Sequence, residues 1–156
     1  MTYIPSNDFQ PMAPPVSRPA KRPVVILIED DNRIAHALEM LIGDWGYECV
    51  AVRTPDAAAE HLGDRLGEAV AIVADFSRDD AFVGRRSAEA ITHALGADLP
   101  RIVTTNDPAE AEAHGFSDVL AKPYDPEQLK VWLADHTAPR KGQGRKAPTK
   151  SAQSVR

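Results

Sequence analysis

VVILIEDDN, residues 24–32, is the stretch that decides the fold. It opens with five apolar residues, four of them β-branched. An unbroken apolar run is typical of a strand covered on both faces, as in a parallel sheet. Three acids follow at once, Glu29, Asp30 and Asp31, and adjacent carboxylates repel one another. Because ligands bind at the carboxyl ends of strands in open parallel sheets, the stretch predicts a buried strand that delivers an acidic cluster to a cation site.

The rest of the chain alternates short apolar runs with segments of helical periodicity. Further strands are expected over residues 47–52, 68–74, 100–104 and 117–121. Helices are expected over 34–45, from Thr54-Pro55 to about Leu66, over about 86–95, from Asp107-Pro108 to His114, and after Asp125-Pro126. This order predicts a flavodoxin-like α/β fold, a doubly wound five-stranded parallel sheet with helices on both faces. Right-handed crossovers then bring all the strand ends to one edge.

The first helix shows the pattern most clearly. Its apolar residues recur at helical spacing and are expected to pack on the sheet: Ile34, Leu38, Leu41, Ile42 and Trp45. Either Asp31 or Asn32 can cap the start of this helix, and Gly46 follows its end. For Asp31, the role of helix cap is favoured over that of a metal ligand.

Charge is distributed unevenly along the 156 residues, a length that suits one domain. Residues 24–137 hold 22 acids against 9 bases, whereas residues 138–156 hold six bases and no acid. The acidic middle argues against a body that binds nucleic acid. We expect a disordered Pro-rich arm over 1–22, one domain over 23–137 and a disordered basic tail over 138–156. The tail is expected to be solubilising, with contact to nucleic acid or an acidic partner as the alternative.

Cys49 is the single cysteine, so no disulfide or cysteine metal cluster is available within the chain. We expect it to be a small buried thiol. The sequence shows neither the apolar core of a signal peptide nor an apolar run of about 20 residues, the length of a membrane helix. A cytoplasmic protein without a membrane partner is therefore expected.

Polar residues end the central strands of the predicted sheet. Glu29, Asp30 and Asp75 offer the oxygen ligands that Mg²⁺ prefers. Lys122 follows the fifth strand and offers a compact positive charge, while Thr104 offers a hydroxyl at the end of the fourth. A carboxylate flanked by a cation, an ammonium group and a hydroxyl can attack phosphorus and form an acyl phosphate.

Four motifs in this order at strand ends resemble the receiver domain of two-component response regulators. They are IEDDN after the first strand, VADF at the third, IVTT at the fourth and AKPY after the fifth. The resemblance covers about residues 23–136. The loop after the third strand, with ALGADLPRIVTT behind it, resembles receivers attached to hybrid histidine kinases more than those of transcriptional regulators. It implies the CheY-like form of the flavodoxin-like fold.

The resemblance also implies roles for individual residues. Asp75 is expected to accept the phosphoryl group, and Glu29 and Asp30 to form the acidic pair that binds Mg²⁺ together with Asp75. The backbone carbonyl of Ser77 would be a further metal ligand. Thr104 would be the switch hydroxyl, although Thr105 stays open as the alternative because the register of the strand decides between them. Lys122 would contact the phosphoryl group.

Three features depart from the usual receiver pattern. The loop DFSRDDAFVG after the third strand lacks the usual proline and adds two acids, Asp79 and Asp80. Val119 occupies the position that commonly carries an aromatic switch residue, three before Lys122. The fourth helix is also expected to be short, which puts the usual output face in doubt.

Three classes of function compete. The first is a stand-alone receiver, not an enzyme in the usual sense, that is phosphorylated by a histidine kinase or His-phosphotransfer protein and acts through an unidentified downstream protein. Its output would be protein contact or onward phosphotransfer. The second is an adaptor with a receiver fold that works without phosphorylation. The third, a small flavodoxin-like enzyme or a nucleotide-binding domain, is disfavoured because acids stand where a glycine-rich phosphate loop belongs.

Overall fold

The structure, a computed structural model, describes residues 20–76 and 88–138. The expectations for most of the Pro-rich arm, for the tail beyond Ala138 and for the acidic loop that contains Ser77 fall outside these residues.

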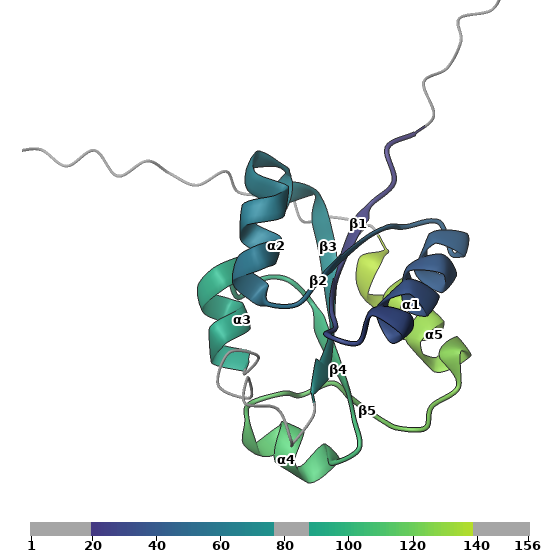
Figure 1. Cartoon of the computed structure of the whole chain (residues 1–156), viewed down its shortest axis with the longest axis vertical. Coiled ribbons are helices and arrows are strands. Elements are labelled where there is room, and N and C mark those ends of the chain that lie inside the picture. The colour runs from purple at the N-terminus through teal and green to yellow at the C-terminus, as the bar shows by residue number, and fades with distance from the viewer. Residues whose placement is uncertain (1–19, 77–87, 139–156) are drawn as a thin grey trace, which may run out of the picture.

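A five-stranded parallel sheet forms the centre of the molecule (Figure 1). The strands are β1 (Val24–Ile28), β2 (Glu48–Val52), β3 (Ala69–Phe76), β4 (Arg101–Thr105) and β5 (Val119–Ala121). Their order is β2-β1-β3-β4-β5, and every neighbouring pair is parallel. The predicted doubly wound sheet is therefore confirmed. β1 lies between β2 and β3 with all five residues buried, as its unbroken apolar run indicated.

Helices cover both faces of the sheet. They are α1 (Asn32–Asp44), α2 (Pro55–Leu62), α3 (Ala88–Leu95), α4 (Pro108–Ala113) and α5 (Pro126–Thr137). Figure 1 shows α2 and α3 on one side of the sheet and α1 and α5 on the other. Alternate residues of the strands feed two separate core clusters, because side chains along a strand point to opposite faces.

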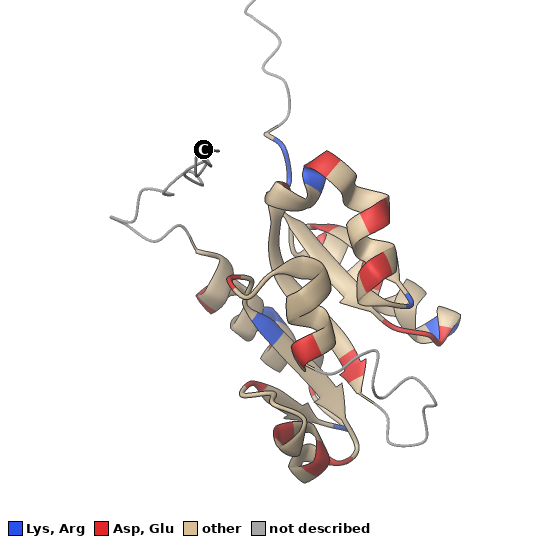
Figure 2. Cartoon of the chain, turned by 90° about the vertical axis from the view of Figure 1, so that its left-hand side faces the viewer, with Lys and Arg blue, Asp and Glu red and all other residues tan. Residues whose placement is uncertain are grey.

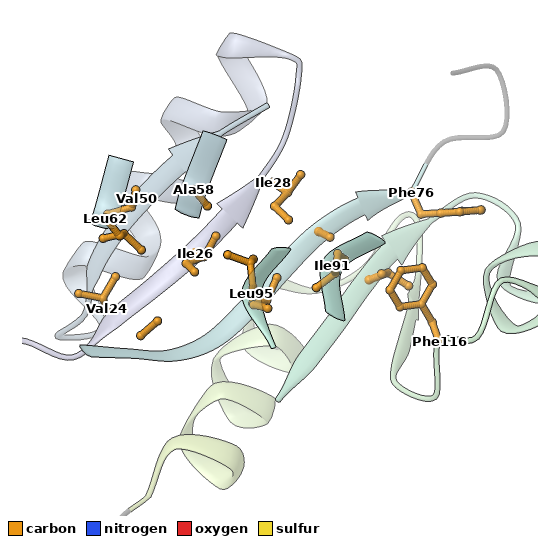
Figure 3. Packing of buried hydrophobic residues seen from close by; sticks show 14 of the residues in the cluster. Val24, Ile26, Ile28, Val50, Ala58, Leu62, Phe76, Ile91, Leu95 and Phe116 are labelled. Atoms are coloured by element: carbon orange, nitrogen blue, oxygen red, sulfur yellow. The ribbon is translucent and has the colours of Figure 1, made fainter. Parts of the chain in front are cut away.

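The core on the α2 and α3 side is drawn in Figure 3. Ile26 and Ile28 of β1 meet Ala58 of α2 and Ile91 of α3 there, and all four side chains are fully buried. The other face packs Val25 and Leu27 against α1 and α5 in the same way. Because β1 is enclosed on both faces, the acids that follow it are held at a fixed place on the carboxyl edge of the sheet.

Some predicted boundaries were wrong. The second helix leaves the α-helical path at Leu62 and continues as a 3₁₀ helix, η1 (Gly63–Glu68). Gly63 has φ +50°, a left-handed conformation that suits glycine and ends an α-helix. β5 begins at Val119, two residues later than expected, and β3 extends through Asp75 to Phe76.

Ile34 is a second exception, since it belonged to the stripe expected to pack on the sheet. Its side chain is 43% exposed. The residues of α1 that are buried, Ala35, Leu38 and Ile42, follow one another at helical spacing. Ile34 lies beside that stripe in the first turn and faces solvent. The expected cap is confirmed, because the Asp31 side chain accepts hydrogen bonds from the backbone N–H groups of Arg33 and Ile34.

Cys49 is a half-buried free thiol on β2 that packs against the α1 and α5 side of the core. Burial, together with the negative charge of Glu39, raises the pKa of its thiol to about 12. Since only the thiolate reacts, we expect maleimide to label the folded chain at pH 8 at least about 100-fold more slowly than the chain in 8 M urea. Labelling at the unfolded rate would contradict this burial, and Cys49→Ala serves as the blank.

Among the residues that the structure describes, no helix combines the length and the apolar character needed to cross a membrane.

Candidate functional site

The strand register places the predicted site residues side by side. Asp75 of β3 is the direct partner of Thr104 on β4. Ile28 pairs with Ala74, so Glu29 comes next to Asp75 at the edge of the sheet. The residue before each of Glu29, Asp75 and Thr104 packs in the core on the α2 and α3 side. Because successive side chains along a strand point to opposite faces, these three point to the face covered by α1 and α5. Residues 29, 75 and 104 are far apart in the sequence, and the parallel sheet alone brings them together.

Three carboxylates converge at this point. Glu29, Asp30 and Asp75 each have a carboxylate oxygen within 4.8 Å of the others. Glu29 and Asp75 are 5% and 6% exposed, whereas Asp30 lies at the surface. The Glu29 side chain is oriented by the backbone that follows it, because Glu29 Oε1 accepts a hydrogen bond of 2.9 Å from the N–H of Asp31. The cluster is therefore closed on its inner side and open toward solvent at Asp30.

This crowding perturbs the ionisation of Glu29. Burial raises the pKa of its carboxyl from 4.5 to about 7, and the negative charge of Asp75 adds to the rise. The hydrogen bond from Asp31 and the positive charge of Lys122 act in the opposite direction and are outweighed. A carboxyl that holds its proton near neutral pH reports excess negative charge in a region shielded from water.

We expect Glu29→Gln to flatten the pH dependence of stability in the absence of divalent cations. Between pH 4.5 and 7 the unfolded wild-type chain releases the Glu29 proton while the folded chain retains it, so stability falls as pH rises through this window. The variant lacks the group, so it should gain about 1–3 kcal/mol on wild type between pH 4.5 and 8. Urea unfolding in EDTA measures this difference, and parallel profiles for the two chains would contradict it.

Lys122 completes the inner wall of the site. Its Nζ donates to Asp75 Oδ1 in an ion pair, and its side chain is half-buried. The backbone fixes where this side chain starts, because the N–H of Lys122 donates to the carbonyl of Thr105 at 2.8 Å. Asp75 thus lies between two further carboxylates on one side and an ammonium group on the other.

The register also separates the two threonines. Thr104 is 3% exposed and shares the face of Asp75. Thr105 points to the opposite face, where its Oγ1 accepts a hydrogen bond of 3.0 Å from the N–H of Asp107 at the start of α4. The Thr105 hydroxyl therefore organises the turn into α4, and Thr104 is the hydroxyl at the acidic site.

One residue near the site was not anticipated from the sequence. Tyr124, two residues after Lys122, is half-buried and packs against the core on the α1 and α5 side. Burial, followed by the negative charges of Glu29 and Asp75, raises the pKa of its phenol. In the sequence, the available signal for Tyr124 was its position two residues after Lys122. Only the fold shows that the chain turns back toward the carboxylates there.

The donor set fits a magnesium ion. Three carboxylate oxygens at this spacing are hard ligands of the kind that Mg²⁺ takes, and the open side at Asp30 leaves room for the waters that Mg²⁺ keeps. The raised pKa of Glu29 points the same way, because a divalent cation would stabilise the buried carboxylate and offset the repulsion from Asp75 that adds to the rise. Ser77, the other predicted ligand, falls outside the described residues, so its carbonyl has no assigned position.

Two hollows on the described part of the chain lie away from the acidic cluster. One of about 310 Å³ lies at the opposite, amino-terminal edge of the sheet and is lined among others by Ala69, Asp98 and His136. An adjoining, more apolar one of about 440 Å³ shares Ala69 and Leu99 with it. Neither includes a residue of the acidic cluster, which lies at the carboxyl edge.

Comparison with known proteins identifies the fold. The sequence matches no family model and no curated protein. Many solved structures do match, and those below cover about three quarters of this chain. The chain is 21% identical to the receiver domain of the sensor histidine kinase PA1611 from Pseudomonas aeruginosa, with a TM-score of 0.58 over 76% of this chain and 98% of that one. That structure holds a magnesium ion in its active site cleft.

Two further structures agree. The chemotaxis protein CheY4 from Vibrio cholerae is 20% identical, with a TM-score of 0.57 over 74% of this chain and 98% of that one. The signal receiver domain of an HD domain-containing protein from Pseudomonas fluorescens is 22% identical, with a TM-score of 0.58 over 74% and 94%. The chain therefore has the CheY-like fold of response regulator receiver domains, as its motifs suggested.

Proposed function

We propose that this chain is a receiver that accepts a phosphoryl group on Asp75 in a Mg²⁺-dependent reaction. The observation that carries the proposal is the setting of Asp75, a nearly buried carboxylate within 4.8 Å of two others and paired with Lys122. A purely structural aspartate would be expected to avoid such repulsion. Strongly perturbed groups that converge at a strand end are typical of functional sites.

The chemistry follows from the arrangement. An Asp75 oxygen attacks phosphorus, the bond from phosphorus to the donor's leaving atom breaks, and the leaving group departs with that electron pair. The product is an acyl phosphate on Asp75. Glu29, Asp30 and Asp75 would hold Mg²⁺, which supplies positive charge against the phosphoryl oxygens. Lys122 would transfer its ion pair from Asp75 to a phosphoryl oxygen, and Thr104 would donate its hydroxyl to the phosphoryl group.

The physiological donor in this proposal is a histidine kinase or a His-phosphotransfer protein. The chain would act in the cytoplasm as a stand-alone module whose output is contact with a downstream protein or onward phosphotransfer. Its chemistry would be limited to its own phosphorylation and dephosphorylation. The likeness to receivers of known kinases and chemotaxis proteins supports this assignment at the level of the fold.

A phosphorylation-independent adaptor is the second candidate, and two observations favour it. Val119 has no aromatic ring that could change rotamer between states, and α4 is only six residues long. A short helix has little capacity to move as a unit. The adaptor keeps the receiver fold but does not use the acidic site for signalling.

Intact mass measurement distinguishes the two. The purified chain is incubated with acetyl phosphate or phosphoramidate, with Mg²⁺ in one arm and EDTA in the other. The receiver is expected to gain the mass of one phosphoryl group with Mg²⁺ and nothing in EDTA. If neither small donors nor a panel of phosphorylated histidine kinases from the same organism gives an adduct, the adaptor is the correct function.

A further inference from the structure

A second cation stands on the β2 side of the acidic site. Val52 is the partner of Ile28, and the pairing continues because the N–H of Glu29 donates to the Val52 carbonyl at 2.9 Å. Arg53 therefore takes the next place along β2, beside Glu29. The row across the carboxyl edge of the sheet reads Arg53, Glu29, Asp75, Thr104.

The Arg53 side chain lies on the same face as the site. Its Nη2 donates to Asn32 Oδ1 at 3.4 Å, and Asn32 is the first residue of α1, the helix that covers this face. Arg53 is exposed and forms no ion pair with any residue that the structure describes. Most other exposed cations of the described residues pair with carboxylates, such as Arg65 with Glu48 and Glu68, Lys21 with Glu68, and Arg33 with Asp31. Arg22, far from the site, donates instead to the carbonyl of Gly43 at 3.4 Å. Arg53 thus offers a positive charge that no described carboxylate neutralises.

An anionic donor meets an electrostatic obstacle on this molecule. The described residues carry 20 Asp and Glu against 8 Lys and Arg, and Figure 2 shows red well in excess of blue on the ribbon. Two of those acids, Glu29 and Asp30, lie beside the Asp75 carboxylate that must attack phosphorus. Lys122, the cation within the site, already forms an ion pair with Asp75. A dianionic phosphoryl group therefore gains from a further cation at the rim.

We propose that Arg53 binds the phosphoryl group of the incoming donor and holds it on the β2 side of Asp75, opposite Lys122. Neighbouring strands lie about 4.8 Å apart, so the Cα atoms of Arg53 and Asp75 are separated by roughly 10 Å across β1. An extended arginine covers most of that span. The distance is also close to the Debye length of about 8–10 Å at physiological salt, so the attraction is not screened away.

The chemistry of the group suits this role. A guanidinium is always charged and presents paired N–H donors that match two oxygens of a phosphoryl group. The weak contact with Asn32, at 3.4 Å, is easily exchanged for such a pair. Arg53 takes part in no bond making or breaking. Its contribution is to donor binding, and it rests on the proposed function of Asp75.

The test compares Arg53→Gln with Arg33→Gln. Both substitutions remove one exposed arginine near the site, but Arg33 is 93% exposed in its side chain and pairs with Asp31, outside the row. Initial rates of phosphorylation are measured by intact mass over a range of acetyl phosphate concentrations with Mg²⁺. We expect Arg53→Gln to lower kcat/KM about 3- to 10-fold through a raised KM, as befits one charge contact at this range. Arg33→Gln is expected to stay within about twofold of wild type.

Three more arms make the result specific. Arg53→Lys should recover part of the loss, and the gap between wild type and Arg53→Gln should shrink at 0.5 M salt. Phosphoimidazole, which mimics phosphohistidine, should show the same loss as acetyl phosphate if the phosphoryl group is what Arg53 binds. A loss with acetyl phosphate alone would assign the contact to the acetyl leaving group and overturn the proposal. Mg²⁺ affinity, read from the thermal midpoint, should be unchanged by Arg53→Gln beyond a small electrostatic effect.

Failure of this inference can be told from failure of the proposed function. A wild-type chain that takes up no phosphoryl group overturns both. A wild-type chain that is phosphorylated, with Arg53→Gln and Arg33→Gln equally active, overturns only the role of Arg53. A fall in kcat without a rise in KM, or a loss that 0.5 M salt leaves intact, also overturns it, because either would indicate a structural effect.

Discussion

Asp75→Asn is expected to abolish phosphorylation by any donor, lowering the yield of the adduct below detection from near stoichiometric. Asparagine is close to aspartate in size and keeps one oxygen in place, but its neutral amide is a far weaker nucleophile than a carboxylate. Intact mass after incubation with acetyl phosphate and Mg²⁺ measures the effect. Because Asp75 is 6% exposed, a shape-conserving change is preferable to alanine, which would also open a cavity.

The matched control is Asp98→Asn. Asp98 is exposed and lines the hollow at the opposite edge of the sheet, so its loss changes the net charge equally and leaves the site intact. This control should be phosphorylated like wild type. An adduct of one phosphoryl group on Asp75→Asn would place the acceptor elsewhere, and peptide mapping would then locate it. Circular dichroism of both variants confirms that loss of the adduct is not loss of the fold.

The sequence was sufficient to predict the sheet because its central strands are almost wholly apolar. β1 and β3 are enclosed on both faces, so each is an almost unbroken apolar run. Such a run can be recognised as a buried strand without knowledge of the neighbouring elements. The acids at their ends could be predicted to meet, since parallel strands align their carboxyl ends. Glu29, Asp75 and Lys122 could therefore be predicted as neighbours from their positions at strand ends alone.

Other features needed three dimensions. The choice between Thr104 and Thr105 depends on a one-residue register, which sends neighbouring side chains to opposite faces. The end of α2 depends on the left-handed conformation of Gly63, which the local sequence permits but does not require. Arg53 lies outside the four motifs, and Tyr124 ends the AKPY motif without a role that the motif assigns; their proximity to the carboxylates follows from strand pairing and from the turn after Lys122.

Lys122→Met carries the second large effect, a loss of stability that depends on Mg²⁺. The ammonium group is the cation paired with Asp75, whose side chain is only 7% exposed. Without this charge, the carboxylates of Glu29, Asp30 and Asp75 repel one another in a region where little water can screen them. Removing one partner of a buried ion pair costs about 3–5 kcal/mol, and because Lys122 is 26% exposed we expect about 1–3 kcal/mol here.

Urea unfolding in EDTA measures that loss, and Lys130→Met is its control. Lys130 pairs with Glu127 at 3.5 Å on the surface of α5, where an ion pair contributes at most about 1 kcal/mol. We expect Lys130→Met to stay within about 0.5 kcal/mol of wild type. Equal effects of the two substitutions would show that the pair of Lys122 with Asp75 is no more than a surface contact.

Mg²⁺ and a double variant then assign the cause. If repulsion among the carboxylates destabilises Lys122→Met, adding Mg²⁺ should restore most of its stability, because a bound divalent cation replaces the lost charge. Combining Lys122→Met with Asp75→Asn should also cost less than the sum of the two changes, since the neutral amide no longer needs a cation. Additive effects and indifference to Mg²⁺ would instead mean that the methylene stem of Lys122 stabilises the fold by packing. In that case the ammonium group is available to the phosphoryl group without any loss of stability.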